Sequence, residues 1–360
     1  MMSKIFLLNN NPPSSGVGRY AYTLYQHLIR SGCEVFFVAW DKELFDTVFY
    51  KMNFFNLKWF YYLLKLKYLS INLNVNDSIV HVANAGYLAS VIPLLKKRNN
   101  SVIITVHDLI PFAAPRSLLM DIFMRNKMLY VVDADYVICI SESTKKDLIK
   151  FIEIDPNKVK VIYYGVDHKL FKPRNKLEVR QMLRLPQNRP IILNVGSEEL
   201  RKNIPTLLKS FKELLIDIPN ALLVRVGEST LGIRKLIKDL NLEGKVLYRK
   251  ASANKVALYY NAADVLCFPS YYEGFGNPPL EAMASGLPVI ASNRTSIPEV
   301  VDDGGILLDP FDVEGFAYWM REVLTNEDLR NRLSEKGYKR SLNFSWEKCA
   351  RETLEVYGRF

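Results

Sequence analysis

The sequence has few of the residues that bind metals or form cross-links. Its 360 residues include four cysteines and four histidines. The cysteines form no CxxC pair and have no histidine at ligand spacing; they are Cys33, Cys139, Cys267 and Cys349. We therefore expect neither a disulfide framework nor a zinc site, and a reducing, cytoplasmic setting.

Long apolar runs are also scarce. The first apolar run of the chain, Ile5–Leu8, is too short for a signal peptide and predicts a β-strand instead. The most apolar window, Ile79–Leu95, contains His81, Asn84 and Pro93, so it divides into a strand and a helix. We expect no transmembrane span, and a protein that is cytoplasmic or peripheral on the inner face of the cell membrane.

The composition is that of a globular protein with an anionic partner. Apolar residues make up 49% of the chain, which excludes a disordered protein. The formal net charge of +10 favours binding to nucleotide phosphates, a lipid head group or nucleic acid. Charge alone does not choose among these three partners.

Short apolar runs alternate with helical segments, and most runs are apolar at nearly every position, as in a parallel sheet buried on both faces. The predicted strands are Ile5–Leu8, Glu34–Ala39, Ile79–Val82, Val102–Val106, Tyr136–Ile140 and Val159–Tyr163, then Ile191–Val195, Leu222–Val226, Val246–Tyr248, Val265–Phe268 and Val289–Ala291. The polar segment Phe171–Arg189 separates the two sets and is the expected linker. We predict two doubly wound, Rossmann-like α/β domains with a ligand in the cleft between them.

The segment Phe49–Leu69 differs from the rest of the chain. Nine of its 21 residues are aromatic, and Lys51, Lys58 and Lys65 are seven residues apart, so a helix would carry them as one basic stripe. That pattern is typical of a helix lying on an anionic membrane surface. A helix packed on its own domain, with its lysines in water, explains it equally well.

A glycine-containing loop follows the predicted strand that ends at Phe268. Gly274 and Gly276 allow close approach of the backbone to a ligand, and Asn277 is the expected N-cap of the next helix, with Pro278 at its first position. A glycine loop leading into a helix N-terminus is an anion site. The expected donors to a phosphate are the amides of Phe275, Gly276, Asn277 and Leu280.

Two glutamates flank this loop. Glu281 lies in the following helix, where a carboxylate suits the paired hydroxyls of a ribose, and Glu273 lies on the loop itself, within reach of sugar hydroxyls. The string resembles the Glu–seven residues–Glu motif of family 4 glycosyltransferases, which have the GT-B fold, and the resemblance continues through residues 281–289 and 297–301. It implies that Glu273 contacts the donor sugar and Glu281 holds the ribose. A capped helix with surface acids is the alternative.

A second loop, from Gly196 to Asn203, contains the adjacent cations Arg201 and Lys202. An Arg fork and a compact Lys charge suit a diphosphate, and without a metal they are the natural groups to stabilise it as it leaves. The family has a similar Gly…Arg-Lys-Asn loop. The alternative is a solvated surface pair.

His107 lies at the end of a predicted strand, in the string Thr105-Val-His-Asp-Leu. Similar strings occur in the N-terminal domain of the family, which implies that His107 hydrogen-bonds the donor sugar; a structural histidine is the alternative. The resemblance also implies that the loop with Gly16 and Gly18 lines the cleft near the donor phosphates, although a plain tight turn explains both glycines too. Gly227 follows another strand, where the nucleotide often packs.

The resemblance assigns the domains. It implies an acceptor-side domain over residues 1–170, with a C-terminal helix at about 343–360 packing back on it, and a nucleotide-sugar-binding domain over residues 171–342. The expected activity is retaining, metal-independent transfer of a sugar from a GDP- or UDP-linked donor to a glycan or lipid-linked acceptor, without a cofactor. The loop from Gly196 to Asn203 looks most like those of mannosyltransferases for surface polysaccharides, which suggests GDP-mannose.

Rival functions remain open at this point. Another GT-B activity, a sugar phosphorylase or a nucleotide-sugar epimerase, is the enzymatic alternative, although nothing in the sequence marks a pyridoxal lysine or a site for free phosphate. A basic module that binds nucleic acid or membrane would explain the net charge of +10 but not the Glu273–Glu281 string. We therefore do not expect nucleic acid as a partner.

Overall fold

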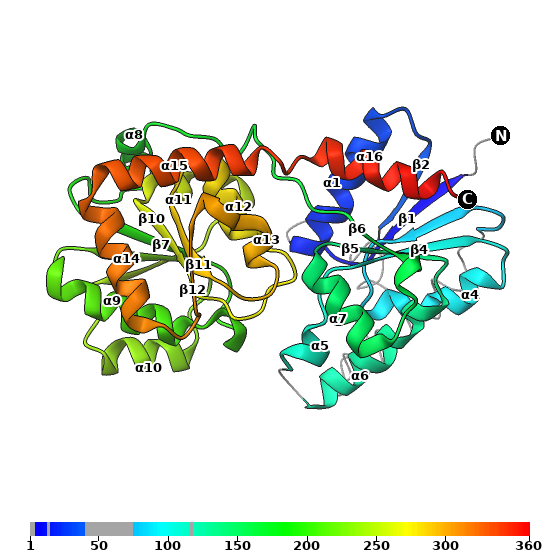
Figure 1. Cartoon of the computed structure of the whole chain (residues 1–360), viewed down its shortest axis with the longest axis horizontal. Coiled ribbons are helices and arrows are strands. Elements are labelled where there is room, and N and C mark those ends of the chain that lie inside the picture. Colours follow the sequence, from blue (N-terminus) through cyan, green and yellow to red (C-terminus); the bar gives the residue numbers. More distant parts are fainter. Residues whose placement is uncertain (1–3, 13–14, 40–74, 116–117) are drawn as a thin grey trace, which may run out of the picture. The chain divides into compact units, whose positions relative to one another are not determined.

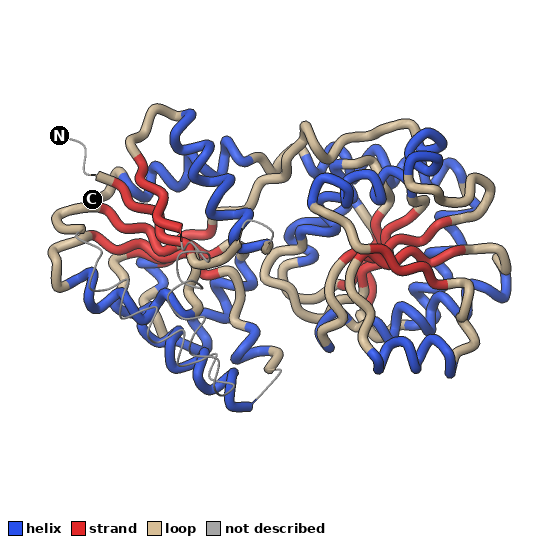
Figure 2. Tube along the Cα trace, turned by 180° about the vertical axis from the view of Figure 1, so that it is seen from behind, coloured by secondary structure: helices blue, strands red, loops and turns tan. Residues whose placement is uncertain are grey.

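The computed structural model describes residues 4–12, 15–39, 75–115 and 118–360. The segment Phe49–Leu69 lies outside these residues. The chain forms two compact units, Met1–Tyr163 together with Trp346–Phe360, and Tyr164–Ser345 (Figure 1). In each unit the strands form one layer with helices on both sides (Figure 2).

The first unit contains a parallel six-stranded sheet in the order β2-β1-β3-β4-β5-β6. Its strands are β1 Ile5–Asn9, β2 Val35–Ala39, β3 Ile79–Val82, β4 Ser101–Val106, β5 Tyr136–Cys139 and β6 Val159–Val161. Its helices are α1 Gly16–Arg30, α4 Ile92–Lys96, α5 Ile110–Ala113, α6 Leu118–Met128, α7 Glu142–Ile152 and α16 Trp346–Tyr357, with 3-10 helices at Tyr87–Val91, Leu129–Asp133 and Pro156–Lys158. The buried strand residues and the inner faces of α4 and α7 form its core.

The second unit repeats this plan, with a parallel sheet in the order β12-β11-β10-β7-β8-β9. Its strands are β7 Ile191–Val195, β8 Leu222–Val226, β9 Val246–Arg249, β10 Val265–Phe268, β11 Val289–Ser292 and β12 Ile306–Leu308. Its helices are α8 Lys176–Met182, α9 Ile204–Asp217, α10 Leu231–Asp239, α11 Ala253–Ala262, α12 Asn277–Ala284, α13 Ile297–Val301, α14 Val313–Thr325 and α15 Glu327–Ser341, with 3-10 helices at Leu200–Lys202 and Asp302–Gly304. The predicted fold class, α/β with two Rossmann-like sheets, is confirmed. The edge strand β12, which is only half-buried, was not predicted.

The linker prediction for Phe171–Arg189 is wrong, because this segment packs inside the second unit. It contains α8, and Val179 and Leu185 are buried. Its polar character has another cause: the buried Arg180 donates hydrogen bonds to the Asp264 carboxylate at 2.7 Å and to the Ala262 carbonyl at 2.8 Å. The chain passes from one unit to the other at Tyr164 instead.

The last helix, α16, belongs to the first unit and packs against α1. Trp346, Cys349 and Val356 are buried there. The Tyr357 hydroxyl lies 2.6 Å from Nδ1 of His81 on β3, so a hydrogen bond fastens the helix to the sheet.

Each sheet has one place where the strand order reverses, and ligands of doubly wound sheets bind there, beyond the carboxyl ends of the strands. In the first unit β1 lies between β2 and β3, and in the second unit β7 lies between β8 and β10. A ligand-binding site is therefore expected at the loops that follow β1, β3, β7 and β10.

The described part of the chain shows neither a membrane-spanning helix nor a metal-binding cluster. None of its helices combines the length and the apolar character needed to span a bilayer. Within the same residues, no three His, Cys, Asp or Glu side chains are grouped so that they could hold a metal ion. All four cysteines are free.

Candidate active site

Three charged side chains meet at the switch point of the second sheet. Arg201 and Lys202 lie in the loop after β7, and Glu273 lies in the loop after β10. Nη1 of Arg201 donates to Oε2 of Glu273 at 2.8 Å, and Nζ of Lys202 donates to Oε1 at 2.6 Å. The structure therefore brings together residues that are more than seventy positions apart and that the sequence had singled out separately.

Further hydrogen bonds fix this cluster in place. Oγ of Ser270 donates to Oε1 of Glu273 at 2.6 Å, and Oγ of Ser296 donates to the Glu273 carbonyl at 2.8 Å. The Glu273 N–H donates to Oγ1 of Thr295 at 3.0 Å. Nε of Arg201 donates to Oε2 of Glu199 at 2.9 Å. The charges are held before any ligand arrives.

The cluster is nearly dry, and this affects its protonation. The side chains of Arg201, Lys202 and Glu273 are 13%, 11% and 10% exposed. Burial acts to raise the pKa of Glu273, but Lys202 and Arg201 outweigh it and hold that pKa below its ordinary value. Burial lowers the pKa of Lys202, and the Glu273 carboxylate opposes this. The carboxylate and the two basic side chains thus favour each other's charged forms.

Lys202 retains capacity to bind an anion. Among the described residues its Nζ has one hydrogen-bond partner, Glu273, and it lies 5.3 Å from the centre of the Phe268 ring. An ammonium has three N–H donors, so two remain for a ligand. A fixed cation with spare donors, in a nearly dry site, can stabilise a negative charge that develops during a reaction.

The loop before α12 differs from the expectation in two details. The cap position is Gly276, not Asn277, and its φ of 120° is a conformation that glycine adopts without strain. The Leu280 N–H donates to the Gly276 carbonyl at 3.2 Å, so this amide serves the helix and not a phosphate. The Phe275 ring is buried between Tyr164 and Phe344, with ring centroids 5.1 Å and 5.9 Å away. The amides of Phe275, Gly276 and Asn277 remain the predicted donors.

Glu281 is buried on α12, and its orientation has a defined cause. The hydroxyl of Tyr260, a fully buried residue of α11, donates to Oε2 of Glu281 at 2.9 Å. Tyr260 could not be singled out from the sequence, because an aromatic residue on an apolar helix face is usually core. The contact of Glu281 with a ribose stays a prediction.

Gly227 and Gly196 mark a close approach of two backbones at the ends of β8 and β7. A Cβ on Gly227 would overlap the carbonyl oxygen of Gly196. Gly196 itself has a φ of 137°, and its N–H donates to the Val226 carbonyl at 3.0 Å. Packing within the unit therefore requires Gly227, and the backbone conformation favours glycine at position 196, whatever Gly227 contributes to nucleotide binding.

A buried polar network beside these glycines was missed from the sequence. Arg225 of β8 is fully buried, donates to Oδ1 of Asn194, and lies 3.6 Å from Oε1 of Glu198. The Glu198 carboxylate also accepts the Tyr248 hydroxyl at 2.6 Å and the Thr230 N–H at 2.5 Å. Burial and the hydrogen bond to Glu198 raise the pKa of Tyr248 to about 12, so the phenol stays protonated.

In the first unit, His107 follows β4 and is buried. Its Nε2 lies 2.6 Å from the Ala83 carbonyl, so this nitrogen carries the proton and donates it. Burial lowers the pKa of His107 to about 4, which leaves the ring neutral at pH 7 with Nδ1 as its acceptor nitrogen. The Tyr20 ring meets the His107 ring edge-on, with centroids 5.0 Å apart. A neutral acceptor suits a sugar hydroxyl, and this role stays a prediction.

Next to His107, a second histidine is structural. Nε2 of His81 lies 2.7 Å from Oγ1 of Thr105, and the same hydroxyl lies 3.1 Å from the Tyr20 hydroxyl. With Tyr357 on the other ring nitrogen, His81 links β3, β4, α1 and α16. Burial lowers the pKa of His81 to about 3.

The two glycines after β1 have different surroundings. Gly18 lies in the first turn of α1, where a Cβ would overlap the Pro12 carbonyl, and its N–H donates to the capping Oγ of Ser15 at 3.0 Å. Gly16 begins the helix with open space where a Cβ would lie. Packing explains Gly18, while a role of either glycine near a phosphate stays a prediction.

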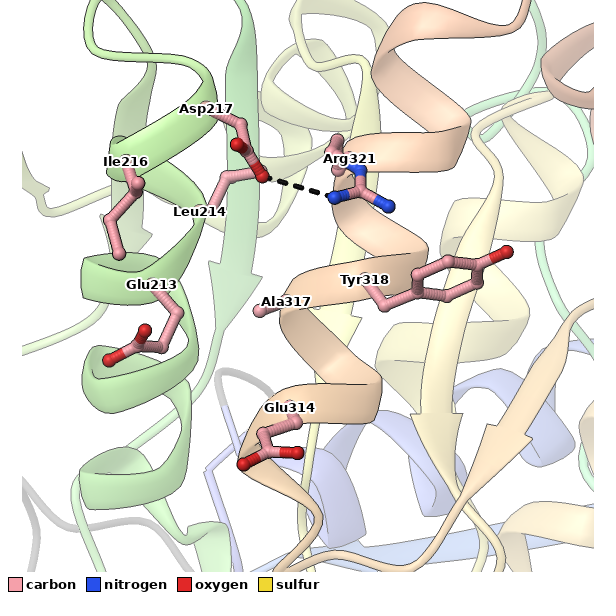
Figure 3. Close-up of a pocket in the computed structure, with 8 residues that line it drawn as sticks. All are labelled: Glu213, Leu214, Ile216, Asp217, Glu314, Ala317, Tyr318 and Arg321. Atoms are coloured by element: carbon pink, nitrogen blue, oxygen red, sulfur yellow. Dashed lines mark hydrogen bonds and ion pairs between the residues drawn. The ribbon is translucent and has the colours of Figure 1, made fainter.

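A groove of about 210 Å³ lies elsewhere in the second unit, between α9 and α14 (Figure 3). Arg321 and Asp217 form an ion pair across it at 3.2 Å. The helix α9 begins just after Lys202, so its last residues lie away from the carboxyl ends of the strands. The groove is not part of the charged cluster.

Family models match both parts of the chain. Residues 14–170 match the family described as Glycosyltransferase Family 4, and residues 175–340 match the family described as Glycosyl transferases group 1. The chain belongs to the family 4 glycosyltransferases. Both units are thus covered by glycosyltransferase families.

Curated relatives of the chain are named as glycosyltransferases. The D-inositol 3-phosphate glycosyltransferase of Nocardioides sp. is 32% identical over 246 residues, which cover 63% of this chain and 54% of that protein. The O-antigen chain mannosyltransferase B of Escherichia coli is 29% identical over 273 residues, which cover 73% of this chain and 71% of the relative. The match thus spans about half the length of the first relative.

Solved structures show the fold. Sucrose-phosphate synthase from Thermosynechococcus elongatus superposes with a TM-score of 0.79 at 23% identity, covering 99% of this chain and 98% of that chain. The Anabaena protein HepE, in complex with UDP and glucose, has a TM-score of 0.79 at 17% identity, covering 99% and 100%. This chain therefore has the GT-B fold.

Proposed function

We propose that this glycosyltransferase moves a sugar from a nucleoside diphosphate sugar to a hydroxyl of a glycan or lipid-linked acceptor, with retention of configuration and without a metal. The observation that carries the proposal is the Arg201–Lys202–Glu273 cluster at the switch point of the second sheet. Buried, fixed cations at the carboxyl ends of strands suit a diphosphate. The names of the curated relatives support the reaction class.

In the proposed reaction, one bond at the anomeric carbon is exchanged for another. The acceptor oxygen forms a bond to the anomeric carbon while the bond from that carbon to the diphosphate oxygen breaks. The acceptor oxygen attacks from the face that the diphosphate leaves, which preserves the configuration, and the leaving phosphate takes the acceptor's proton. Arg201 and Lys202 stabilise the negative charge that develops on the leaving diphosphate, and Glu273 keeps both cations in place.

The donor can be tested by ligand stabilisation. We expect a nucleoside diphosphate to raise the melting temperature of the purified chain without added metal, because a ligand that binds only the folded state stabilises it by mass action. GDP and GDP-mannose are the expected ligands, since the relatives include an O-antigen mannosyltransferase. The measurement is a thermal shift with GDP, UDP and their sugars, each with a chelator present.

Two results of this panel would change the account. Stabilisation by UDP compounds alone would replace the GDP donor with a UDP donor and leave the transfer reaction in place. No shift with any nucleotide would contradict the proposal. Adding orthophosphate to the panel separates transfer from a phosphorylase, which would require free phosphate.

A membrane surface as partner has support in the first unit. The face of α6 opposite its buried Asp121 carries apolar side chains: Leu119, Met120 and Ile122 are 83%, 44% and 45% exposed. Nζ of Lys127 lies 5.4 Å from the centre of the Phe123 ring. Figure 1 shows α6 next to α5 on the outside of the unit. Exposed apolar residues with an adjacent cation are typical of a helix that lies on an anionic bilayer.

Vesicle binding tests this partner. We expect the chain to co-sediment with phosphatidylcholine vesicles that contain phosphatidylglycerol, and to be released by salt. The double substitution Leu119→Ser/Ile122→Ser should reduce binding, whereas Ile216→Ser, at an exposed position of the second unit, should not. Wild-type chain that stays in solution at low salt would contradict a membrane partner, and unchanged binding of the double variant would exclude α6.

A further inference from the structure

Arg225 is a charged residue in the middle of a buried parallel strand. Its neighbours on β8 are apolar, and it is among the largest fully buried side chains of the described residues. Its Nε is buried without a hydrogen-bond partner in the same part of the structure. A hydrophobic residue at such a position is often equally or more stabilising, so stability alone does not account for this arginine.

The polar partners of Arg225 lie at the end of β7 and in the loop that follows it. Nη1 donates to Asn194 of β7, Nη2 donates to the Gly196 carbonyl at 3.3 Å, and Nη2 lies 3.6 Å from the Glu198 carboxylate. Glu198 in turn accepts the hydroxyl of Tyr248 on β9 and the N–H of Thr230, which follows β8. The side chains of both ions are fully buried.

Glu198 lies in the same short loop as Arg201 and Lys202, the two cations of the charged cluster. Only two residues separate Glu198 from Arg201, and the loop between β7 and α9 contains both. On one side, Glu198 fastens this loop to β8 and β9. On the other side, Arg201 and Lys202 reach the loop after β10 through Glu273. The loop is thus held at two points, and the cations lie at the second.

We infer that Glu198 and Arg225 are positioning residues, which fix the Arg201–Lys202 loop at the geometry that transfer requires. The inference rests on the proposed function for its effect on rate. Neither side chain is accessible to a ligand, so both act through the loop. Groups that support a catalytic site in this way affect activity by about 10- to 100-fold when removed, by analogy with supporting residues of metal sites.

The decisive variant removes both charges together. Glu198→Leu/Arg225→Leu leaves no uncompensated buried ion, so we expect it to fold with a melting temperature near that of the wild type. We expect its turnover, measured as nucleoside diphosphate release with the donor that stabilises the wild type best, to fall at least about 10-fold. Hydrogen exchange of the amides of residues 196–203, without ligand, should become faster.

A stable double variant with wild-type turnover and wild-type exchange in this loop would show that the pair is only structural, and would overturn the inference. If the double variant does not fold, Tyr248→Phe removes one bond to Glu198 and keeps both charges, and the same faster exchange is expected. Lys339→Gln, at an exposed ion pair of α15, is the control that should change nothing.

The exchange measurement also separates this inference from the proposed function. If wild-type chain releases no nucleoside diphosphate from any donor, the proposed transfer fails, but exchange in residues 196–203 still reports whether Glu198 and Arg225 hold the loop.

Discussion

Replacing Lys202 with alanine is expected to slow sugar transfer by about 100- to 1,000-fold, the loss seen when one preorganised donor to a developing negative charge is removed. The ammonium of Lys202 is nearly buried, fixed by Glu273, and retains donors for the leaving diphosphate. Water entering in its place is neither fixed nor charged. The measurement is the steady-state rate of nucleoside diphosphate release, with donor at saturating concentration.

The fold should survive this change. Glu273 keeps its ion pair with Arg201 and its hydrogen bond from Ser270, so the buried carboxylate is not left alone. Lys339→Ala is the matched control, because that lysine pairs with Glu335 on the exposed surface of α15, where an ion pair contributes little. Near-normal turnover of a folded Lys202→Ala chain would show that the site is assigned wrongly.

Acidification from pH 6.5 to pH 4.5 is expected to destabilise the first unit by several kcal/mol. The pKa values of His81 and His107 are about 3 and about 4 in the folded chain, whereas an unfolded histidine has a pKa of about 6.5. Between these values the unfolded chain binds protons that the folded chain does not, so stability falls as pH falls. The full effect is about 1.4 kcal/mol per pH unit for each histidine.

This effect is a large fraction of the stability of a domain, which is about 5–15 kcal/mol. Hydrogen exchange of the amides of β3 and β4, measured at several pH values, would localise it to the first unit. The variant His81→Gln has lost one of the two titrating groups, so the pH dependence of its unfolding free energy should be shallower. An equal pH dependence in wild type and variant would contradict the assignment of His81 as a buried, neutral histidine.

The strands and the charged loops could be predicted from the sequence because their signals are local. A strand buried on both faces is a short apolar run, and each of Arg201–Lys202 and Glu273 lies in a glycine-containing loop directly after such a run. Parallel strands place these loops at the same edge of the sheet. The contact between the two loops then follows from the strand order, which puts β7 next to β10.

The rest depends on partners that are distant in sequence. Arg225 looks like an interruption of an apolar strand, and nothing local indicates that Glu198 and Tyr248 surround it. The same holds for Tyr260, whose hydroxyl orients Glu281. The supposed linker was misjudged for a similar reason, because the polar Arg180 is paired with Asp264, 84 residues further along the chain.

The most direct test of the proposed function is acceptor-dependent release of nucleoside diphosphate from a nucleotide sugar, in the presence of a chelator. Wild-type chain is compared with Lys202→Ala and Lys339→Ala, using the donor selected by thermal shift and a mixture of glycan and lipid-linked acceptors. We predict release by wild type and Lys339→Ala, and release that is slower by about 100-fold or more by Lys202→Ala. A donor that binds the wild type but yields no nucleoside diphosphate with any acceptor, or equal release by all three proteins, would contradict the account.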